Sequence, residues 1–253
     1  MSSSIINISH PSKTISASCN LPGSKSESNR VLIINELAGK KIQIENLSSA
    51  DDTQELKRLL ASPFKTLDVK DAGTSMRFLI AYYCVINKNK VISGSQRMQE
   101  RPIGKLVDAL RYIGFKIHYL QKEGFPPVEI IPTERPHLKY EVNVDADESS
   151  QFISAVLIIA PVFPDGLTVK LQKKIVSKSY IKMTVGIMKM CGVNSTWKKN
   201  EIRIDHQKYK PVKFSVEPDW SAASYWYGIA ALSQESQIEL KGFKKESFQG
   251  DQI

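Results

Sequence analysis

Short runs rich in β-branched residues alternate along the chain with longer segments whose apolar residues recur at helical spacing. This alternation is typical of a layered fold of helices and strands, so the fold class predicted is mixed α/β (α+β). The predicted helices are 26–38, 52–61, 74–85, 102–113, 149–159, 179–191 and 221–232. The predicted strands are 4–8, 14–18, 42–45, 67–69, 91–93, 116–119, 128–131, 140–144, 167–171, 194–197, 201–204, 213–215 and 237–240.

Four of these helices begin in the same way, with a small or acidic residue, one or two hydroxyl residues and then an apolar run. The starts lie near Gly23, Asp71, Glu148 and Asp219. Each of the four helices is apolar almost all round, so we expect it to be buried with its N-terminus at a surface or cleft. A single Ser, Thr or Asp there is usually an N-cap. Because the same pattern is repeated at four helix N-termini, and some of them also carry cationic residues, it favours a site that attracts anions.

Two cationic segments strengthen this interpretation. Residues 21–30 (LPGSKSESNR) place a Pro-Gly turn, several serines, Lys25 and Arg30 at one helix start, an arrangement suited to a phosphorylated or carboxylated small molecule. Arg101 precedes Pro102, which we expect to be the first residue of another helix, so its guanidinium could bind a carboxylate or phosphate bidentately. The alternative for Arg101 is a surface ion pair with Glu100. Ser177 and Tyr180 open a further helix, where a capping serine alone is a weak signal.

Composition narrows the function classes. The 253 residues carry a formal charge of +9, but aromatic residues are not interleaved with the lysine clusters, so we expect a solvated basic surface that attracts small anions and no nucleic-acid partner. The longest apolar run, 152–163, is too short to cross a bilayer, and the first residues do not resemble a signal peptide. Three cysteines and four histidines are scattered. We therefore expect a cytoplasmic protein without a membrane segment or a metal site.

Six segments occur in the order found in one known family. They are 21–30, 71–77, 97–103, 149–152, 177–180 and 219–225. Together they closely resemble the EPSP synthase (3-phosphoshikimate 1-carboxyvinyltransferase) family, over essentially the whole chain. The resemblance implies transfer of the enolpyruvyl group of phosphoenolpyruvate to the 5-hydroxyl of shikimate 3-phosphate, giving 5-enolpyruvylshikimate 3-phosphate and phosphate. This reaction belongs to the shikimate pathway of chorismate and aromatic amino acid biosynthesis. The resemblance also implies a monomer without cofactor or metal.

The resemblance implies a fold of two similar domains, each built from three βαβαββ-like repeats around buried helices. By this reading, residues 1–12 contribute the first strand of the second domain, and residues 13–216 form the complete first domain, the shikimate 3-phosphate-binding half. Residues 217–253 form the crossover and the incomplete start of the second domain. The family's remaining acid/base residues have no counterpart before Ile253. We therefore expect a truncated form that is inactive alone.

Site roles carry over by the same resemblance. Lys25 would contact both substrates and is the one catalytic residue expected in this chain. The residues expected to bind shikimate 3-phosphate are Lys25, Ser26, Arg30, Ser149, Ser150, Gln151, Ser177 and Tyr180. Those expected to bind phosphoenolpyruvate are Lys25, Gly73, Arg101 and Gln151; glyphosate occupies this pocket in sensitive members. The departures from the family pattern are Asp71, Ser179, Lys182 and the pair Asp219-Trp220, from which we expect altered affinity rather than a different activity.

Two alternatives remain open. A UDP-N-acetylglucosamine enolpyruvyl transferase would share the fold, but it lacks the Ser-Lys-Ser-x-Ser-Asn-Arg pattern and carries a reactive loop cysteine that we do not find here. A non-catalytic anion- or RNA-binding module is supported by net charge alone. It would show salt-sensitive binding without preference for shikimate 3-phosphate.

Overall fold

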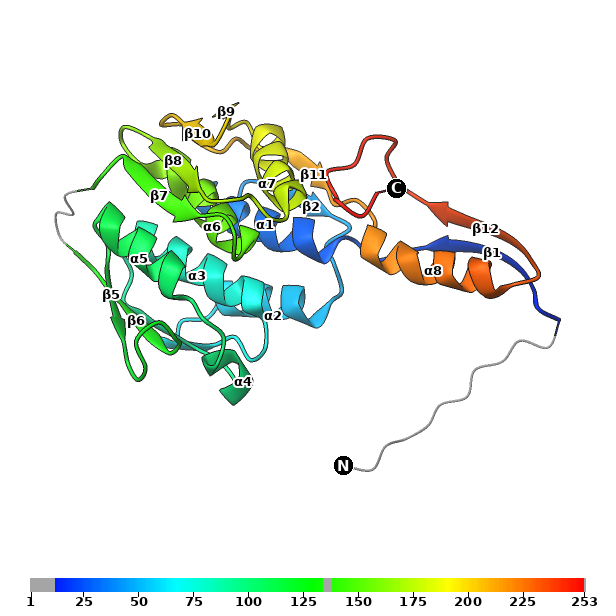
Figure 1. Ribbon diagram of the computed structural model, residues 1–253, viewed down its shortest axis with the longest axis horizontal. Helices are drawn as coiled ribbons and strands as arrows, with labels where there is room; N and C mark the ends of the chain where they lie inside the picture. Colours follow the sequence, from blue (N-terminus) through cyan, green and yellow to red (C-terminus); the bar gives the residue numbers. More distant parts are fainter. Residues whose placement is uncertain (1–11, 134–137, 253) are drawn as a thin grey trace.

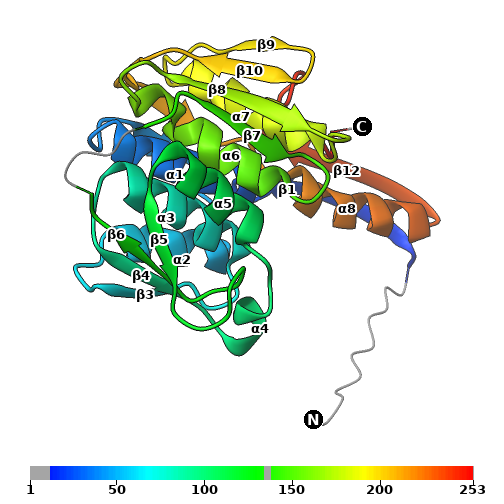
Figure 2. The same ribbon diagram turned by 60° about the vertical axis from the view of Figure 1, so that its left-hand side comes forward.

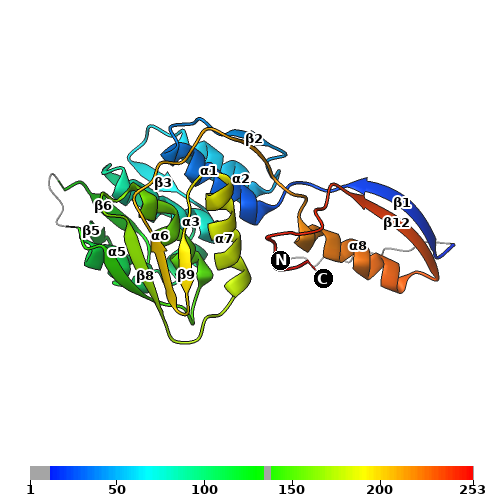
Figure 3. The same ribbon diagram turned by 90° about the horizontal axis from the view of Figure 1, so that it is seen from above.

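The computed structural model describes residues 12–133 and 138–252, so the predicted strand 4–8 lies outside the described residues. The chain forms a main body, residues 21–133 and 138–217, and an elongated second lobe made of residues 12–20 and 218–252 (Figures 1 and 3). The mixed α/β class is confirmed.

The first repeat of the main body is a four-stranded sheet with two longer helices. Its strands are β3 (Thr66–Asp68), β4 (Lys90–Ser93), β5 (Lys116–Tyr119) and β6 (Val128–Ile131), in the spatial order β3-β4-β6-β5. Strands β3 and β4 are parallel, and the other neighbours are antiparallel. Helix α3 (Gly73–Val85) joins β3 to β4; the short helix α4 (Gln96–Gln99) and helix α5 (Gly104–Ile113) lie between β4 and β5.

The second repeat has the same plan. Its strands are β7 (Glu141–Asp145), β8 (Leu167–Gln172), β9 (Thr196–Lys198) and β10 (Glu201–Ile204), in the order β7-β8-β10-β9. Helix α6 (Ser150–Ile159), followed by the 3₁₀ turn η1 (Ala160–Val162), joins β7 to β8, and helix α7 (Lys178–Met190) joins β8 to β9. The parallel first pair and antiparallel second pair recur, so the βαβαββ unit is present twice.

A third unit combines distant parts of the chain. It contains α1 (Lys25–Leu37), β2 (Gln43–Glu45), α2 (Asp51–Leu60) and β11 (Lys213–Ser215), with β11 parallel to β2. Helices α1, α3 and α6 contact one another at the centre, and the sheets lie outside them (Figure 2). Val31, Leu79 and Val156, one on each of these helices, are fully buried. This matches the all-round apolar character of the three helices.

The second lobe contains β1 (Thr14–Asn20), α8 (Trp220–Leu232) and β12 (Glu235–Lys241). Strand β1 pairs in parallel with β12 over its whole length. The predicted division placed residues 13–20 in the first domain, but this pairing puts them with the second lobe. The placement of residues 13–20 depends on backbone pairing with a strand more than two hundred residues later in the chain. The local sequence pattern predicts a strand there but not its partner.

The prediction that all four helices are buried is wrong for α8. Ala223 is the one buried residue of this helix, while Tyr225 is 77% and Leu232 89% exposed. Helix α8 packs on one side against β12 and presents its other sides to solvent. Apolar composition all round therefore did not lead to burial in this lobe.

The chain crosses between main body and second lobe at two adjacent places. Ser24 N donates to Glu217 O at 2.8 Å, and Asp219 N donates to Pro22 O at 2.9 Å. Gly23 lies between them, and a β-carbon there would stand 1.9 Å from the carbonyl oxygen of Asn46. Only glycine fits this close approach of backbones.

The predicted bounds of the elements that were expected on the described residues lie within two residues of the observed ones, and one of the two-residue differences is instructive. Helix α5 begins at Gly104 rather than at Pro102, because Ile103 has a φ of −131° and is not helical. Among the described residues, no helix is both long enough and apolar enough to cross a membrane.

Candidate functional site

The starts of several helices meet on one face of the main body. Lys25, the first residue of α1, places its Nζ 3.2 Å from Oδ2 of Asp52 in the first turn of α2. The hydroxyl of Ser75, at the start of α3, reaches the carbonyl oxygen of Asp52 at 3.5 Å. At the start of α6, the Nε2 of Gln151 donates to Oγ1 of Thr74 at 3.1 Å. The repeated helix starts are thus brought together, as the sequence pattern suggested.

Arg30 lies beneath this face, almost fully buried between α1, α6 and α7. Its Nε donates to Oγ1 of Thr184 at 2.8 Å, its Nη2 to Oγ of Ser154 at 3.2 Å and its Nη1 to the carbonyl oxygen of Ser26 at 2.8 Å. The ring of Tyr180 lies 5.7 Å from the guanidinium carbon. Burial lowers the pKa of Arg30 to about 10, so the side chain is charged at neutral pH. Its acceptors are neutral oxygens, and none of the ion pairs found among the described residues includes Arg30, so an unpaired positive charge lies beneath this face.

Two further arginines surround the start of α3. The buried Arg77 donates from Nη1 to the carbonyl oxygen of Gly73 at 2.9 Å and from Nη2 to that of Pro102 at 3.2 Å. Arg101 lies against Gly73, because a β-carbon built on this glycine would be 2.6 Å from its Nη1. Burial lowers the pKa of Arg77 to about 10, and the nearby charge of Arg101 acts in the same direction. Two guanidinium groups this close favour an anion between them.

The predicted alternative for Arg101, an ion pair with Glu100, is not found among the described residues. Arg101 follows the end of α4, and its N–H donates to the carbonyl oxygen of Met98 at 3.0 Å. The hydroxyl of Ser95 donates to Oδ1 of Asp71 at 2.6 Å, so the acidic departure at position 71 has a partner in the turn that precedes α4.

The predicted phosphate-binding serines lie on two adjoining loops. Ser149 is the N-cap of α6, with its Oγ accepting the N–H of Gln151 at 3.2 Å, and Ser150 is buried. Ser177 is the N-cap residue of α7 but adopts a φ of 53°, and its side chain makes no capping bond. Ser177 therefore does not cap α7 through its side chain, as a serine at this position could, and its hydroxyl is available to a ligand. The N–H of Val176 donates to the carbonyl oxygen of Ala146 at 3.0 Å, which holds the two loops together.

Sequence reasoning assigned no role to Arg77, Thr74 or Thr184. Arg77 stands four residues after Gly73 on an otherwise apolar helix, and a lone cation in such a helix could have marked it. Thr184 carries no such signal, because a threonine on a buried helix is common, whereas Thr74 is one of the hydroxyl residues of the repeated helix starts. Within the described ranges, no group of three or more His, Cys, Asp or Glu side chains is arranged to hold a metal ion.

Comparisons with a family profile and with individual known proteins all indicate the same family. A profile of the family described as EPSP synthase (3-phosphoshikimate 1-carboxyvinyltransferase) matches residues 56–253. The chain is 45% identical over 245 residues to the 3-phosphoshikimate 1-carboxyvinyltransferase of Bacteroides fragilis (strain YCH46), covering 96% of this chain and 59% of that protein. It is 37% identical over 270 residues to the protein of the same name from Vibrio cholerae serotype O1 (strain M66-2), covering 95% of this chain and 63% of that one.

A solved structure supports the fold. The EPSP synthase of Acinetobacter baumannii superimposes with a TM-score of 0.75 at 19% identity, covering 92% of this chain and 56% of that one. The chain thus spans about 60% of the length of the curated relatives it matches. The family profile matches the chain from α2 to its end, and the matches to relatives named 3-phosphoshikimate 1-carboxyvinyltransferase extend over nearly all of it. The chain therefore belongs to the EPSP synthase (3-phosphoshikimate 1-carboxyvinyltransferase) family.

Proposed function

We propose that this chain binds shikimate 3-phosphate and phosphoenolpyruvate, and serves the transfer of the enolpyruvyl group to the 5-hydroxyl of shikimate 3-phosphate. The observation that carries the proposal is the meeting of cationic and hydroxyl side chains at the starts of α1, α3, α6 and α7 on one face. Relatives named for this activity cover 95–96% of the chain. Free cysteines at positions 19, 84 and 191 support a cytoplasmic location, which we include in the proposal.

Both substrates are multiply anionic. Phosphoenolpyruvate carries a carboxylate and a phosphate, and shikimate 3-phosphate carries one of each. In the reaction, the 5-hydroxyl oxygen gives up its proton to a base and forms a bond to C2 of the enolpyruvyl group, while C3 receives a proton. The resulting tetrahedral intermediate then loses phosphate and a proton from C3, which restores the double bond. Such chemistry requires groups that hold concentrated negative charge in place as it shifts.

We assign these roles to the residues on the shared face. Arg101, supported by Arg77 and given space by Gly73, would hold phosphoenolpyruvate. Arg30 and Tyr180 would lie beside shikimate 3-phosphate, with Ser26 close by.

The remaining contacts to the substrates are assigned from the loops that precede α6 and α7. Ser149, Ser150 and Ser177 would bind the 3-phosphate, because their loops are joined at the starts of α6 and α7. Gln151 would lie between the substrates, since it bridges toward the start of α3. Lys25 would contact both substrates, and its ammonium group would leave the carboxylate of Asp52 to bind them.

The test is calorimetric titration of shikimate 3-phosphate into this chain at low and moderate salt. We expect saturable one-to-one binding, weakened at least roughly tenfold in the double variant Ser149→Ala with Ser150→Ala, since each lost bond to an anion is strong. The control is Ser16→Ala with Ser236→Ala, two exposed serines of the second lobe.

The outcomes separate the proposals. Unchanged binding in S149A/S150A would refute the placement of the 3-phosphate. Binding of shikimate without its phosphate as tightly as shikimate 3-phosphate, or absence of saturable binding, would refute the proposed substrate. Binding of any polyanion with equal strength would favour the anion- or RNA-binding module instead.

A further inference from the structure

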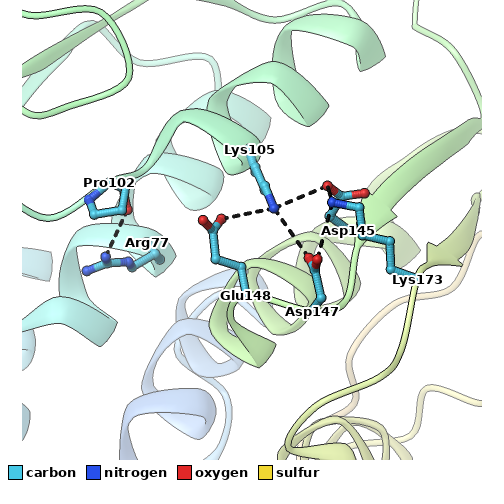
Figure 4. A network of polar contacts seen from close by, with 7 residues as sticks. All are labelled: Arg77, Pro102, Lys105, Asp145, Asp147, Glu148 and Lys173. Carbon is cyan, nitrogen blue, oxygen red and sulfur yellow. Dashed lines mark hydrogen bonds and ion pairs between the residues drawn. The ribbon is translucent and has the colours of Figure 1, made fainter.

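An ion-pair network adjoins the proposed phosphate site. The Nζ of Lys105 lies 3.2 Å from Oδ2 of Asp145, 3.3 Å from Oδ1 of Asp147 and 3.5 Å from Oε2 of Glu148. The Nζ of Lys173 lies 2.8 Å from Oδ2 of Asp145 and 3.2 Å from Oδ2 of Asp147. Figure 4 shows Lys105 at the centre, pointing into the arc of carboxylates.

The network joins the segments that carry the proposed ligands. Lys105 lies in the first turn of α5, four residues after Arg101. Asp147 and Glu148 directly precede Ser149, and Lys173 begins the loop that ends at Ser177. The backbone continues the connection, because Ala146 N donates to Gln172 O at 2.9 Å.

The start of α5 is itself fixed from the opposite side. Arg77 donates to the carbonyl oxygen of Pro102, as Figure 4 also shows. Ile103 N donates to the carbonyl oxygen of Gly124 at 2.9 Å. Lys105 therefore extends from a fixed helix start, and the acidic segment 145–148 is the part that it can hold in place.

The charges explain why such a contact would affect ligand binding. Three carboxylates stand within four residues of Ser149, and an approaching phosphate would be repelled by them. Hydrogen bonding to Asp145 raises the pKa of Lys105, and hydrogen bonds from Lys173 and then Lys105 lower the pKa of Asp145. The groups are thus charged together at neutral pH, and the two lysines offset most of the negative charge.

We propose that Lys105 is a positioning residue for the phosphate of shikimate 3-phosphate: it holds the acidic segment 145–148 and offsets its charge, so that Ser149 and Ser150 can receive the anion. The inference rests on the proposed function, because it assigns Lys105 a part in binding that substrate. Lys105 acts through the loop and does not itself touch the ligand.

A plain surface ion pair is the alternative, and the chain contains a matched example. Lys170 on β8 lies 2.6 Å from Oε1 of Glu141 on β7, in the same sheet. The side chain of Lys170 is 38% exposed and that of Lys105 34%. Lys170 pairs with Glu141 and not with the acidic segment 145–148, so it controls for the loss of one surface lysine on a strand that leads into the same loop.

The test compares K105M, K105R and K170M by calorimetric titration of shikimate 3-phosphate into the full chain. We expect K105M to bind roughly fivefold more weakly, as expected for the loss of a small charge network, K170M to bind like the wild type and K105R to recover most of the affinity. Adding E148Q to K105M should restore part of the affinity, because one uncompensated carboxylate is removed. A merely structural role would not produce this recovery.

Hydrogen exchange at the amides of Ala146 and Val176 supplies a readout without ligand, and we expect faster exchange in K105M than in K170M. If the wild type binds shikimate 3-phosphate, but K105M and K170M show equal binding and equal exchange, the role of Lys105 is overturned and the proposed function stands. Failure of the wild type to bind shikimate 3-phosphate would overturn the proposed function, and the role of Lys105 with it.

Discussion

At the residue scale, Glu27 is a buried carboxyl where the chain crosses between main body and second lobe. It is 2% exposed, and its Oε2 accepts the N–H of Glu217 at 3.1 Å. Burial raises its pKa from 4.5 to about 7, and the charge of Glu217 acts in the same direction. The chain therefore carries an acid at this crossing that changes charge near neutral pH.

The raised pKa predicts a pH-dependent stability. Because the folded protein binds the proton more tightly than the unfolded chain, this contribution is fully present below pH 4.5 and is lost as pH rises to about 7. We expect Glu27→Gln to match the wild type near pH 4.5 and to be more stable by about 3 kcal/mol at pH 8. Urea unfolding at both pH values measures this. Glu246→Gln, at an exposed position, is the control, and a constant difference between E27Q and wild type would contradict the prediction.

Gly73 carries a second prediction at this scale. In Gly73→Ala the β-carbon would lie 2.6 Å and 2.9 Å from the two Nη atoms of Arg101. These are the ends of a flexible side chain, so the guanidinium of Arg101 should move. The β-carbon would also lie 2.9 Å from Nη1 of the buried Arg77, which is held by hydrogen bonds and can yield less. We expect a slightly lowered melting temperature and roughly tenfold weaker binding of phosphoenolpyruvate, titrated in the presence of shikimate 3-phosphate. Gly228→Ala on α8 is the control, since nothing lies within 4 Å of its added carbon. Equal binding by both variants would count against the position proposed for Arg101.

At the element scale, α1, α6 and α7 are held together by Arg30 and two hydroxyls. Thr184 on α7 accepts from the Nε of Arg30, and its oxygen lies 2.8 Å from Oγ of Ser154 on α6. The apolar faces alone could slide along one another, whereas these directional bonds specify how the three helix starts align. The anion-binding face thus depends on a polar contact within the apolar core.

Thr184→Val tests this contact. Valine has a similar volume but leaves the Nε of a buried cation without an acceptor, so we expect a loss of about 2 kcal/mol in the free energy of unfolding. Thr53→Val, which loses only a 2.7 Å bond to the neutral Oδ1 of Asn29, should lose about 1 kcal/mol. Urea unfolding of both variants measures the difference. If T184V were no more destabilised than T53V, the charge of Arg30 would not be what makes the contact important.

At the scale of the whole molecule, the main body and the second lobe differ in burial. Helix α3 has a continuous run of buried residues from Ser75 to Cys84, while α8 in the second lobe has Ala223 alone. Local stability follows the number of buried apolar contacts. The second lobe should therefore open more readily than the body.

Hydrogen exchange provides the measurement. We expect the amides of β1 and β12 to exchange at least roughly tenfold faster than those in the middle of α3, although both sets are hydrogen-bonded. The amides of β10, a strand of the main body, control for strand geometry. Equal protection of β1 and β10 would show that the whole chain opens as one cooperative unit.

Much of the local structure could be predicted from the sequence. The bounds of β5, β6, β10 and β11 agree with the predicted ranges, since each is a short apolar alternation ended by turn residues. The short helix α4 was missed, because four residues carry no periodicity. The ordered motifs correctly indicated the family, while the roles of individual site residues stay predictions.

The sequence by itself determined the positions of the long helices and strands, the shared design of the helix starts and the family. Periodicity, capping residues and ordered motifs are properties of neighbouring residues, so they are readable along the chain. Tertiary structure alone decided that Arg77 lies beside Arg101, that Lys105 faces the acidic segment before Ser149, and that β1 joins β12. These contacts join residues far apart in the chain, and packing and backbone pairing create them only after folding.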